Sequence, residues 1–295
     1  MNKYHRLMEL QQLRYVVALA EERNFTRAAE RCSVVQSALS HQIKALETEV
    51  GVALFARTSR RVNLTTAGEA FLASARASLD AAERAAADAA AAVGDIRGTL
   101  TIGAIPTVTA LDLPATLGDF HRAHPSVRVT VRSGASDDFI TAIADGRLDL
   151  AVLGVSESAP PIRVETRELA RERLVAVVST RHRLAHRQRL RLRDLAHETF
   201  VDFPAQTPGR AQSDLAFRTT DVPRDVAFET MSTDLILGLV RQNLAVALLA
   251  PDVALGEDLR LIPVTDGPTR VQYLAWSSFN PSPATRAFLA VVPKR

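Results

Sequence analysis

Residues 24–63 read NFTRAAERCSVVQSALSHQIKALETEVGVALFARTSRRVN, a pattern that predicts two helices joined by a short turn. Thr26 can cap the first helix, whose apolar face carries two alanines. Residues 32–35 break the pattern, and a second helix is expected from about Gln36 to Glu49 because its apolar side chains recur at helical spacing. This order of elements is that of a helix-turn-helix.

The second helix has two chemically different faces. Its apolar stripe should pack against the first helix and consists of Ala38, Leu39, Ile43, Leu46 and Val50. The other face has hydrogen-bonding and basic side chains and no carboxylate, and consists of Gln36, Ser37, Ser40, His41 and Lys44. Amide and hydroxyl groups reach base edges in a major groove, and cations bind phosphates. The second helix therefore suits the reading of DNA.

A basic loop follows this helix. Gly51 should end the helix in the left-handed conformation that glycine adopts easily. The loop then presents Arg57, Arg60 and Arg61. We interpret it as a wing, a loop whose arginines contact the DNA backbone or the minor groove. The stretch as a whole predicts a winged helix-turn-helix.

Several separate motifs, in register over residues 8–68, resemble the amino-terminal domain of LysR-type transcriptional regulators. They are Met8-Glu9-Leu10, Leu13-Arg14-Tyr15, Phe25-Thr26-Arg27-Ala28-Ala29, Gln36-Ser37-Ala38-Leu39-Ser40, Ile43 to Leu46, Leu54-Phe55-Ala56-Arg57 and Leu64-Thr65-Thr66-Ala67-Gly68. The chain departs from the family at Val35, where a capping Ser is common, and at His41, where Arg is common. The predicted DNA-binding residues are Thr26, Gln36, Ser37, Ser40, His41, Lys44, Arg57, Arg60 and Arg61.

Length and charge agree with this interpretation. The 295 residues are 47% hydrophobic and carry a formal net charge of +3, which allows two or three domains and a sizeable core. Lys plus Arg against Asp plus Glu is 10 to 6 in residues 1–65, 3 to 5 in residues 66–97 and 23 to 22 in residues 98–295. The net charges of +4, −2 and +1 place the basic excess on the segment that resembles a DNA reader.

Cys32 is the only cysteine of the chain. A single cysteine excludes a disulfide framework, a thiolate metal cluster and a two-cysteine peroxide sensor within one chain. We expect Cys32 to be a small buried hydrophobe, with a redox switch as the alternative, and we expect neither a metal nor a cofactor. Because the chain has no leader and no run of 18 apolar residues, we expect a cytoplasmic protein without membrane contact. Met8 is an alternative start to Met1.

An alanine-rich helix is expected after the wing, capped by Thr65 or Thr66 and extending to Val93. Fourteen of the 26 residues from Ala67 to Ala92 are alanine, which favours helix formation. Side chains spaced three and four apart form a heptad seam, which predicts a dimerisation helix; they are Leu72, Ala75, Leu79, Ala82, Ala86, Ala89, Val93 and Ile96. The alternative is a rigid spacer packed on its own domain.

Beyond a hinge at residues 94–98 the pattern alternates between strands and helices. Strands are expected at residues 100–105, 127–132, 148–155, 174–179, 200–203, 226–230, 245–249, 259–264 and 271–277, and helices at 110–123, 138–146, 210–219, 234–242 and 283–292. Such alternation predicts a parallel sheet covered on both faces, with the last two strands returning. The two lobes resemble the periplasmic-binding-protein-like effector domain of the same family, in which the motif of residues 145–151, DGRLDLA, is typical.

The predicted fold class is therefore α/β, with an all-α winged helix-turn-helix first, a long linker helix next and a two-lobed α/β domain last. The predicted domains are residues 8–65 for DNA binding, 66–97 for the linker and dimerisation helix, and 98–295 for effector binding. Within the last domain, lobe I covers about 98–170 and 269–295, and lobe II covers about 171–268.

A small ligand should bind between the lobes, at the carboxyl ends of strands. Hydroxyls and backbone amides at helix starts suit a carboxylate or another polar group. The predicted effector-binding residues are Thr107, Thr109, Ser133, Ser136, Asp202, Phe203, Thr207, Thr230 and Ser232. The alternative for each hydroxyl is that it only caps its helix.

The sequence shows no phosphate-binding glycine loop, no nucleophile elbow and no metal-spaced cluster, so we do not expect an enzyme. By resemblance, dimers pair into homotetramers that bind a partly symmetric operator in double-stranded DNA. A small-molecule effector then changes the subunit arrangement, and with it the recruitment of RNA polymerase. The alternative is a small-molecule sensor that acts through protein partners and has a vestigial DNA-binding domain.

Overall fold

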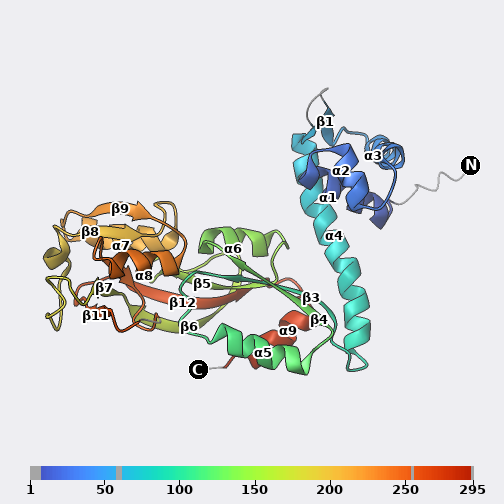
Figure 1. Ribbon diagram of the computed structural model, residues 1–295. Coiled ribbons are helices and arrows are strands. Elements are labelled where there is room, and N and C mark those ends of the chain that lie inside the picture. The colour runs from blue at the N-terminus through green and yellow to red at the C-terminus, as the bar shows by residue number, and fades with distance from the viewer. Residues whose placement is uncertain (1–7, 58–61, 254–255, 294–295) are drawn as a thin grey trace, which may run out of the picture. The chain divides into compact units, whose positions relative to one another are not determined.

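The computed structural model describes residues 8–57, 62–253 and 256–293 (Figure 1). The backbone forms two compact units, one running through Ala89 and the other beginning at Ala90. The first unit is helical apart from one hairpin, and the second combines sheets with helices. The predicted fold class is confirmed.

The first unit contains a helix-turn-helix followed by a short antiparallel hairpin. Its elements in chain order are α1 (Leu10–Glu22), α2 (Phe25–Arg31), α3 (Gln36–Val50), β1 (Phe55–Arg57), β2 (Val62–Leu64) and α4 (Thr66–Ala91). The hairpin pairs Phe55 with Leu64 and Arg57 with Val62. One core joins the three helices to the hairpin and includes Val16, Leu19, Ala28, Leu39, Ile43, Leu46 and Leu54.

The helix ends of this unit differ from the prediction at α2. Asn24 caps that helix, because its side-chain oxygen accepts from the backbone N–H groups of Thr26 and Arg27; the prediction that Thr26 is the cap is wrong. Gly51 ends α3 at a φ of 81°, as predicted. Thr65 caps α4, since its hydroxyl accepts from the Gly68 N–H at 3.0 Å.

The inward stripe of α3 is narrower than predicted. Leu39, Ile43 and Leu46 are fully buried, whereas Ala38 and Val50 are exposed. The helix reaches the core that it shares with α1 and α2 through a single row of side chains. Its remaining circumference lies on the surface of the first unit.

The second unit begins with lobe I, a five-stranded mixed sheet with helices on both faces (Figure 1). Its elements are β3 (Gly98–Ala104), α5 (Leu113–Ala123), β4 (Val127–Ser133), α6 (Ser136–Ala144), β5 (Leu150–Ser156), β6 (Glu165–Arg173), β12 (Thr269–Trp276) and α9 (Pro283–Val291). Alternate residues of β5 face opposite sides. Leu150 and Val152 pack with α5 and α9, and Ala151 and Leu153 pack with α6.

Lobe II follows with shorter strands. Its elements are β7 (Val175–Ser179), the 3₁₀ turn η1 (Leu192–Leu195), β8 (Thr199–Asp202), α7 (Pro208–Thr219), β9 (Asp225–Glu229), α8 (Thr233–Arg241), β10 (Ala247–Leu249) and β11 (Leu259–Pro263). The strand order is β10-β7-β11 in one sheet and β8-β9 in another.

The antiparallel pairing of β7 with β10 corrects the prediction of a parallel sheet in lobe II, whereas β11 and β12 return as predicted. In lobe II, β7 pairs antiparallel with both β10 and β11. In lobe I, the strand order is β4-β3-β5-β12-β6, and β12 is antiparallel to both neighbours. β6 was not predicted, because its sequence ETRELARER is rich in charge; as an edge strand it presents Glu165, Glu168, Arg171 and Arg173 to water.

β6 and β12 form the connection between the lobes. β6 leads from lobe I into β7, and β12 leads back after β11. Where they cross, the Leu174 N–H donates to the Pro268 carbonyl at 3.0 Å. The chain therefore passes between the lobes twice at one place, which makes this strand pair the hinge of the second unit.

α4 contains 26 residues. Across the described ranges, no helix combines the length and apolar character needed to span a membrane.

Candidate nucleic-acid interface and ligand cavity

The predicted reading face of α3 lies on the surface of the first unit. Gln36, Ser37, His41 and Lys44 are exposed and Ser40 is half-buried. The same helix turns its buried row, which includes Leu39, toward α1 and α2. The structure thus brings five predicted DNA-binding side chains onto one open face.

The remaining predicted DNA-binding residues lie away from α3 or outside the described residues. Thr26 is exposed on α2, where its backbone N–H donates to Asn24 at 2.9 Å. Arg57 is the last residue of β1. Arg60 and Arg61 lie outside the described residues.

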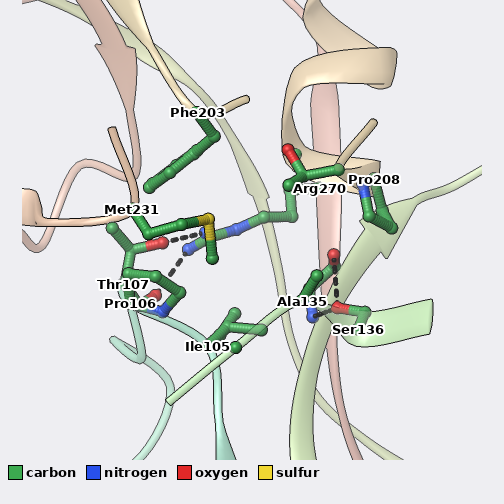
Figure 2. Close-up of a pocket in the computed structure, with 13 residues that line it drawn as sticks. Ile105, Pro106, Thr107, Ala135, Ser136, Phe203, Pro208, Met231 and Arg270 are labelled. Atoms are coloured by element: carbon green, nitrogen blue, oxygen red, sulfur yellow. Dashed lines mark hydrogen bonds between the residues drawn. The ribbon is translucent and has the colours of Figure 1, made fainter. Parts of the chain in front are cut away.

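A small cavity lies between the lobes of the second unit, at the ends of β3 and β8 (Figure 2). Its volume is about 30 Å³, which is room for about two water molecules. Residues from both lobes line it: Ile105, Pro106, Thr107, Gly134, Ala135, Ser136 and Gly154 from lobe I, Phe203, Thr207, Pro208, Gly209 and Met231 from lobe II, and Arg270 from β12. Of the predicted effector residues, Thr107, Ser136, Phe203 and Thr207 are brought together here.

Arg270 is the charged side chain of this cavity, and sequence reasoning missed it. It is 5% exposed, and Figure 2 shows its side chain reaching across the cavity to Thr107. Its Nη1 donates to the Thr107 hydroxyl at 2.6 Å and its Nη2 to the Thr107 carbonyl at 3.1 Å. Burial lowers the pKa of the guanidinium, and the carboxylate of Glu172 opposes that shift.

Glu172 and Gln272 complete a buried polar network around Arg270. Glu172 on β6 forms an ion pair with Arg270, its cross-strand partner on β12. The Gln272 amide also donates to Glu172, at 2.7 Å, and the Thr109 hydroxyl donates to it at 3.2 Å. Thr109, a predicted effector residue, is therefore held in this network beside the cavity. Because Glu172 balances Arg270, the network adds no net charge to the cavity.

Ser136 has a structural partner at the cavity wall. Its hydroxyl donates to the Gly154 carbonyl at 3.1 Å and accepts from the Gly154 N–H at 3.0 Å. A Cβ at Gly154 would lie 2.6 Å from the end of the Ile105 side chain, so a larger residue there would displace that side chain. The contact fixes the start of α6 against β5.

Four further predicted effector residues do not line the cavity. Ser133 and Ser232 are exposed, and Ser232 caps α8 by accepting from the Leu235 N–H. Thr230 accepts from the Ser232 N–H at 3.1 Å. Asp202 is 3% exposed and forms a buried ion pair with Arg224.

Asp202 belongs to a second buried network inside lobe II. Burial raises the pKa of the Asp202 carboxyl, and the guanidinium of Arg224 opposes the shift. Arg224 also bonds Asp214 at 2.6 Å and stacks on Phe200 at 4.7 Å. This network ties β8 to α7 and the segment before β9 rather than facing a ligand.

The predicted dimerisation seam begins inside the first unit. Leu72 packs against the core of that unit, and Ala75 is 2% exposed. Farther along α4, Leu79 and Ala82 are half-buried and Ala86 is exposed. Val93 is 84% exposed and lies beyond the end of α4 at Ala91, so the helix is shorter than predicted.

Among the residues that the structure describes, no group of three or more His, Cys, Asp or Glu side chains is placed to hold a metal ion. Cys32 is half-buried in the first unit, and burial raises the pKa of its thiol. A raised pKa makes the thiol less reactive.

Known proteins resemble the chain over both sites. The family described as "Bacterial regulatory helix-turn-helix protein, lysR family" matches residues 10–69, and "LysR substrate binding domain" matches residues 94–295. The uncharacterized HTH-type transcriptional regulator YnfL of Escherichia coli (strain K12) is 34% identical, over 95% of this chain and 96% of that protein. The Hca operon transcriptional activator HcaR of the same organism is 33% identical, over 98% of both chains. The solved structure of full-length CbnR complexed with its target DNA is 25% identical and has a TM-score of 0.67, over 97% of this chain and 99% of that chain.

Proposed function

Because this chain belongs to the family of LysR-type transcriptional regulators, we propose that the exposed face of α3 reads its operator and that the Arg270 cavity receives its effector. The chain is a DNA-binding transcriptional regulator and not an enzyme. The alternative of a sensor with a vestigial DNA-binding domain is not favoured, because the relatives match the chain through both domains.

One observation carries the DNA-binding part of the proposal. Leu39, Ile43 and Leu46 bury one row of α3 completely, while the amide of Gln36 and the cation of Lys44 stay exposed on the same helix. An amide side chain can bond both N6 and N7 on the major-groove edge of an adenine, and a lysine can bind phosphate. The helix therefore offers both base-specific and backbone contacts to one major groove.

The cavity suits a compact molecule that is mostly apolar and has one polar end. Phe203, Met231 and Ile105 supply apolar wall, and Arg270 and Thr107 supply the polar end. Within the described residues, Arg270 Nη1 makes one hydrogen bond, to Thr107, and a guanidinium carries two N–H donors on that nitrogen. A carboxylate or carbonyl oxygen of the effector would accept from the other.

The small size of the cavity couples binding to the arrangement of the lobes. The walls of the cavity belong to different lobes, so a bulky effector would be accommodated by their separation. The Thr233 hydroxyl of lobe II donates to the Pro106 carbonyl of lobe I at 3.0 Å, a bond that such a separation would break. An effector that prefers the separated arrangement would shift the protein toward it.

We also propose that α4 joins two copies of the chain. Leu79, Ala82 and Ala86 continue the seam beyond the part of α4 that packs on its own unit. Small side chains let two such helices approach closely. Pairing of dimers into a homotetramer and contact with RNA polymerase complete the proposed mechanism, and sedimentation of the purified chain in the presence and absence of DNA tests the assembly.

The DNA-binding part is tested with an operator selected from random-sequence DNA. Gln36→Ala should lose about 1 to 3 kcal/mol of specific affinity, because one bidentate base contact is removed. Arg57→Ala should weaken binding to every sequence alike and flatten the salt dependence by about one phosphate contact. A wild-type titration as flat as that of an uncharged protein, or a Gln36→Ala variant that keeps the full preference for the operator, would contradict the assignment.

The cavity is tested by thermal unfolding in the presence of a panel of small aliphatic and aromatic acids. Thr107→Val should abolish the stabilisation given by an acid that binds the wild type. Thr116→Val is the matched control, since Thr116 is a buried threonine of α5 whose hydroxyl bonds only the Asp112 carbonyl among the described residues. Equal stabilisation of both variants would place the ligand elsewhere.

A further inference from the structure

The wing hairpin, strands β1 and β2, is tied to α3 at its first residues. The backbone N–H of Leu54 donates to Glu47 Oε1 at 2.9 Å, and the N–H of Phe55 donates to the same oxygen at 3.1 Å. Leu54 is fully buried and Phe55 is 4% exposed. One carboxylate oxygen near the end of α3 thus holds the two residues that lead into β1.

The residues that lead into β1 are also bonded to the start of α4. The Thr65 hydroxyl donates to the Ala53 carbonyl at 2.8 Å, and the Thr65 N–H donates to the Leu54 carbonyl at 3.0 Å. A Cβ at Gly68 would lie 2.0 Å from that carbonyl oxygen, so the first turn of α4 touches it. Leu54 is therefore fixed by its N–H to α3 and by its carbonyl to α4.

The negative charge of Glu47 is unfavourable in a DNA-binding surface. It is half-buried on α3, three positions after Lys44, and so continues the row of Gln36, Ser40 and Lys44 toward the end of the helix. Its charge has the same sign as a phosphate and repels DNA over distances up to the Debye length, about 8 Å at physiological salt. Charge alone therefore predicts that Glu47 weakens DNA binding.

We propose that Glu47 is a positioning residue that sets the angle between the reading helix and the wing hairpin, and that DNA binding depends on it despite its charge. The proposal rests on the proposed DNA-binding function. Loss of the Glu47 oxygen removes the bonds that tie the entry of the hairpin to α3, while Thr65 still holds Ala53 and Leu54 to α4. The hairpin would then lose its fixed position beside α3 and would no longer be placed to bind the DNA backbone.

Four variants of the full chain separate geometry from charge. Glu47→Asp keeps the charge but shortens the reach, and Glu47→Gln removes the charge but keeps an oxygen that can accept both N–H groups. Glu47→Met removes both the charge and the accepting oxygen. Glu49→Met is the matched control, because Glu49 is an exposed carboxylate two positions farther along the same helix, and the N–H groups of Leu54 and Phe55 bond Glu47 instead.

The measurement is affinity for the selected operator and for random DNA across a range of salt concentrations. Glu47→Asp and Glu47→Met should bind both DNAs about tenfold more weakly, and the salt slope should fall by about one for each phosphate that the hairpin no longer binds. The preference for the operator over random DNA should stay unchanged, because the reading face is intact. Glu47→Gln and Glu49→Met should bind as tightly as the wild type or more tightly.

The opposite ranking overturns the proposal. If Glu47→Asp binds like the wild type while Glu47→Gln and Glu47→Met bind more tightly, then only the charge of Glu47 matters. Circular dichroism of each variant confirms that it folds, and Glu47→Asp carries the test if Glu47→Met does not fold. A wild type without salt-dependent binding would instead contradict the proposed DNA-binding function, so the two failures are distinguishable.

Discussion

Removing either member of the buried Arg270–Glu172 pair should destabilise the second unit, and the two removals should differ in their response to pH. The side chains are 6% and 9% exposed. An arginine does not lose its proton in a protein, so Glu172→Leu leaves a buried cation without a partner. A carboxyl group can take up a proton, so Arg270→Met can leave a neutral acid.

The magnitudes follow from the burial of the pair. Breaking a buried ion pair by removing one partner costs about 3 to 5 kcal/mol. Protonating a carboxyl group of ordinary acidity costs about 4 kcal/mol at pH 7 and about 1 kcal/mol at pH 5. Because the folded Arg270→Met chain would bind that proton more tightly than the unfolded chain, its penalty relative to the wild type should shrink as the pH falls. The loss of stability caused by Glu172→Leu should not shrink as the pH falls. The double variant Glu172→Leu with Arg270→Met should recover most of the wild-type stability.

The chain contains its own probe for this experiment. Trp276 is the only tryptophan, lies on β12 with Arg270 and packs against the core of lobe I. Its fluorescence during a urea titration reports the unfolding of the second unit at pH 7 and pH 5. Two results would refute the reasoning that the two charges depend on each other. One is a loss of stability in both single variants that is the same at pH 7 and pH 5. The other is a double variant whose loss of stability equals the sum of the two single losses.

Three further predictions concern the first unit and are read from urea unfolding followed by circular dichroism. Gly68→Ala should cost about 1 to 3 kcal/mol, since its Cβ would lie 2.0 Å from the Leu54 carbonyl oxygen; wild-type stability would contradict that close contact. Asn24→Ala should cost about 1 kcal/mol because it removes the cap of α2, whereas Thr26→Ala should change stability by under about 0.5 kcal/mol, and equal losses would restore Thr26 as the cap. Burial alone would raise the pKa of Glu21, but hydrogen bonds from two arginines lower it. Glu21→Gln should therefore lower the free energy of unfolding by under about 1 kcal/mol at neutral pH and leave it unchanged in acid. A loss of stability that persists in acid would contradict the ion pairs.

The first unit could be predicted closely because its signals are local. The spacing of Leu39, Ile43 and Leu46 gives the buried row of α3, and Gly51 marks its end. The cap of α2 was misjudged because Asn24 and Thr26 are both capping residue types within two positions. Only the actual bonds distinguish them.

The second unit could be predicted as alternating strands and helices but not in its pairing. A buried strand such as β7 (VAVVS) has the same apolar pattern in a parallel and in an antiparallel sheet. β6 gave no strand signal, because its alternating charges resemble those of a surface loop. Arg270 and Glu172 are 98 positions apart and meet only because β12 returns beside β6, so the anchor of the cavity could not be found before the register was known.

For the cavity residues, the ends of the predicted strands indicate where the cavity lies but not which side chains point into it. Strand ends give the location, and Thr107 and Phe203 do line the cavity. Asp202 directly precedes Phe203, yet successive side chains of a strand point in opposite directions, and its carboxylate turns into lobe II to meet Arg224. A carboxylate pointing into the cavity would repel the acidic effector that we propose. The end of β8 therefore places the ring of Phe203 at the cavity and the carboxylate of Asp202 away from it, an outcome that the position at a strand end does not determine.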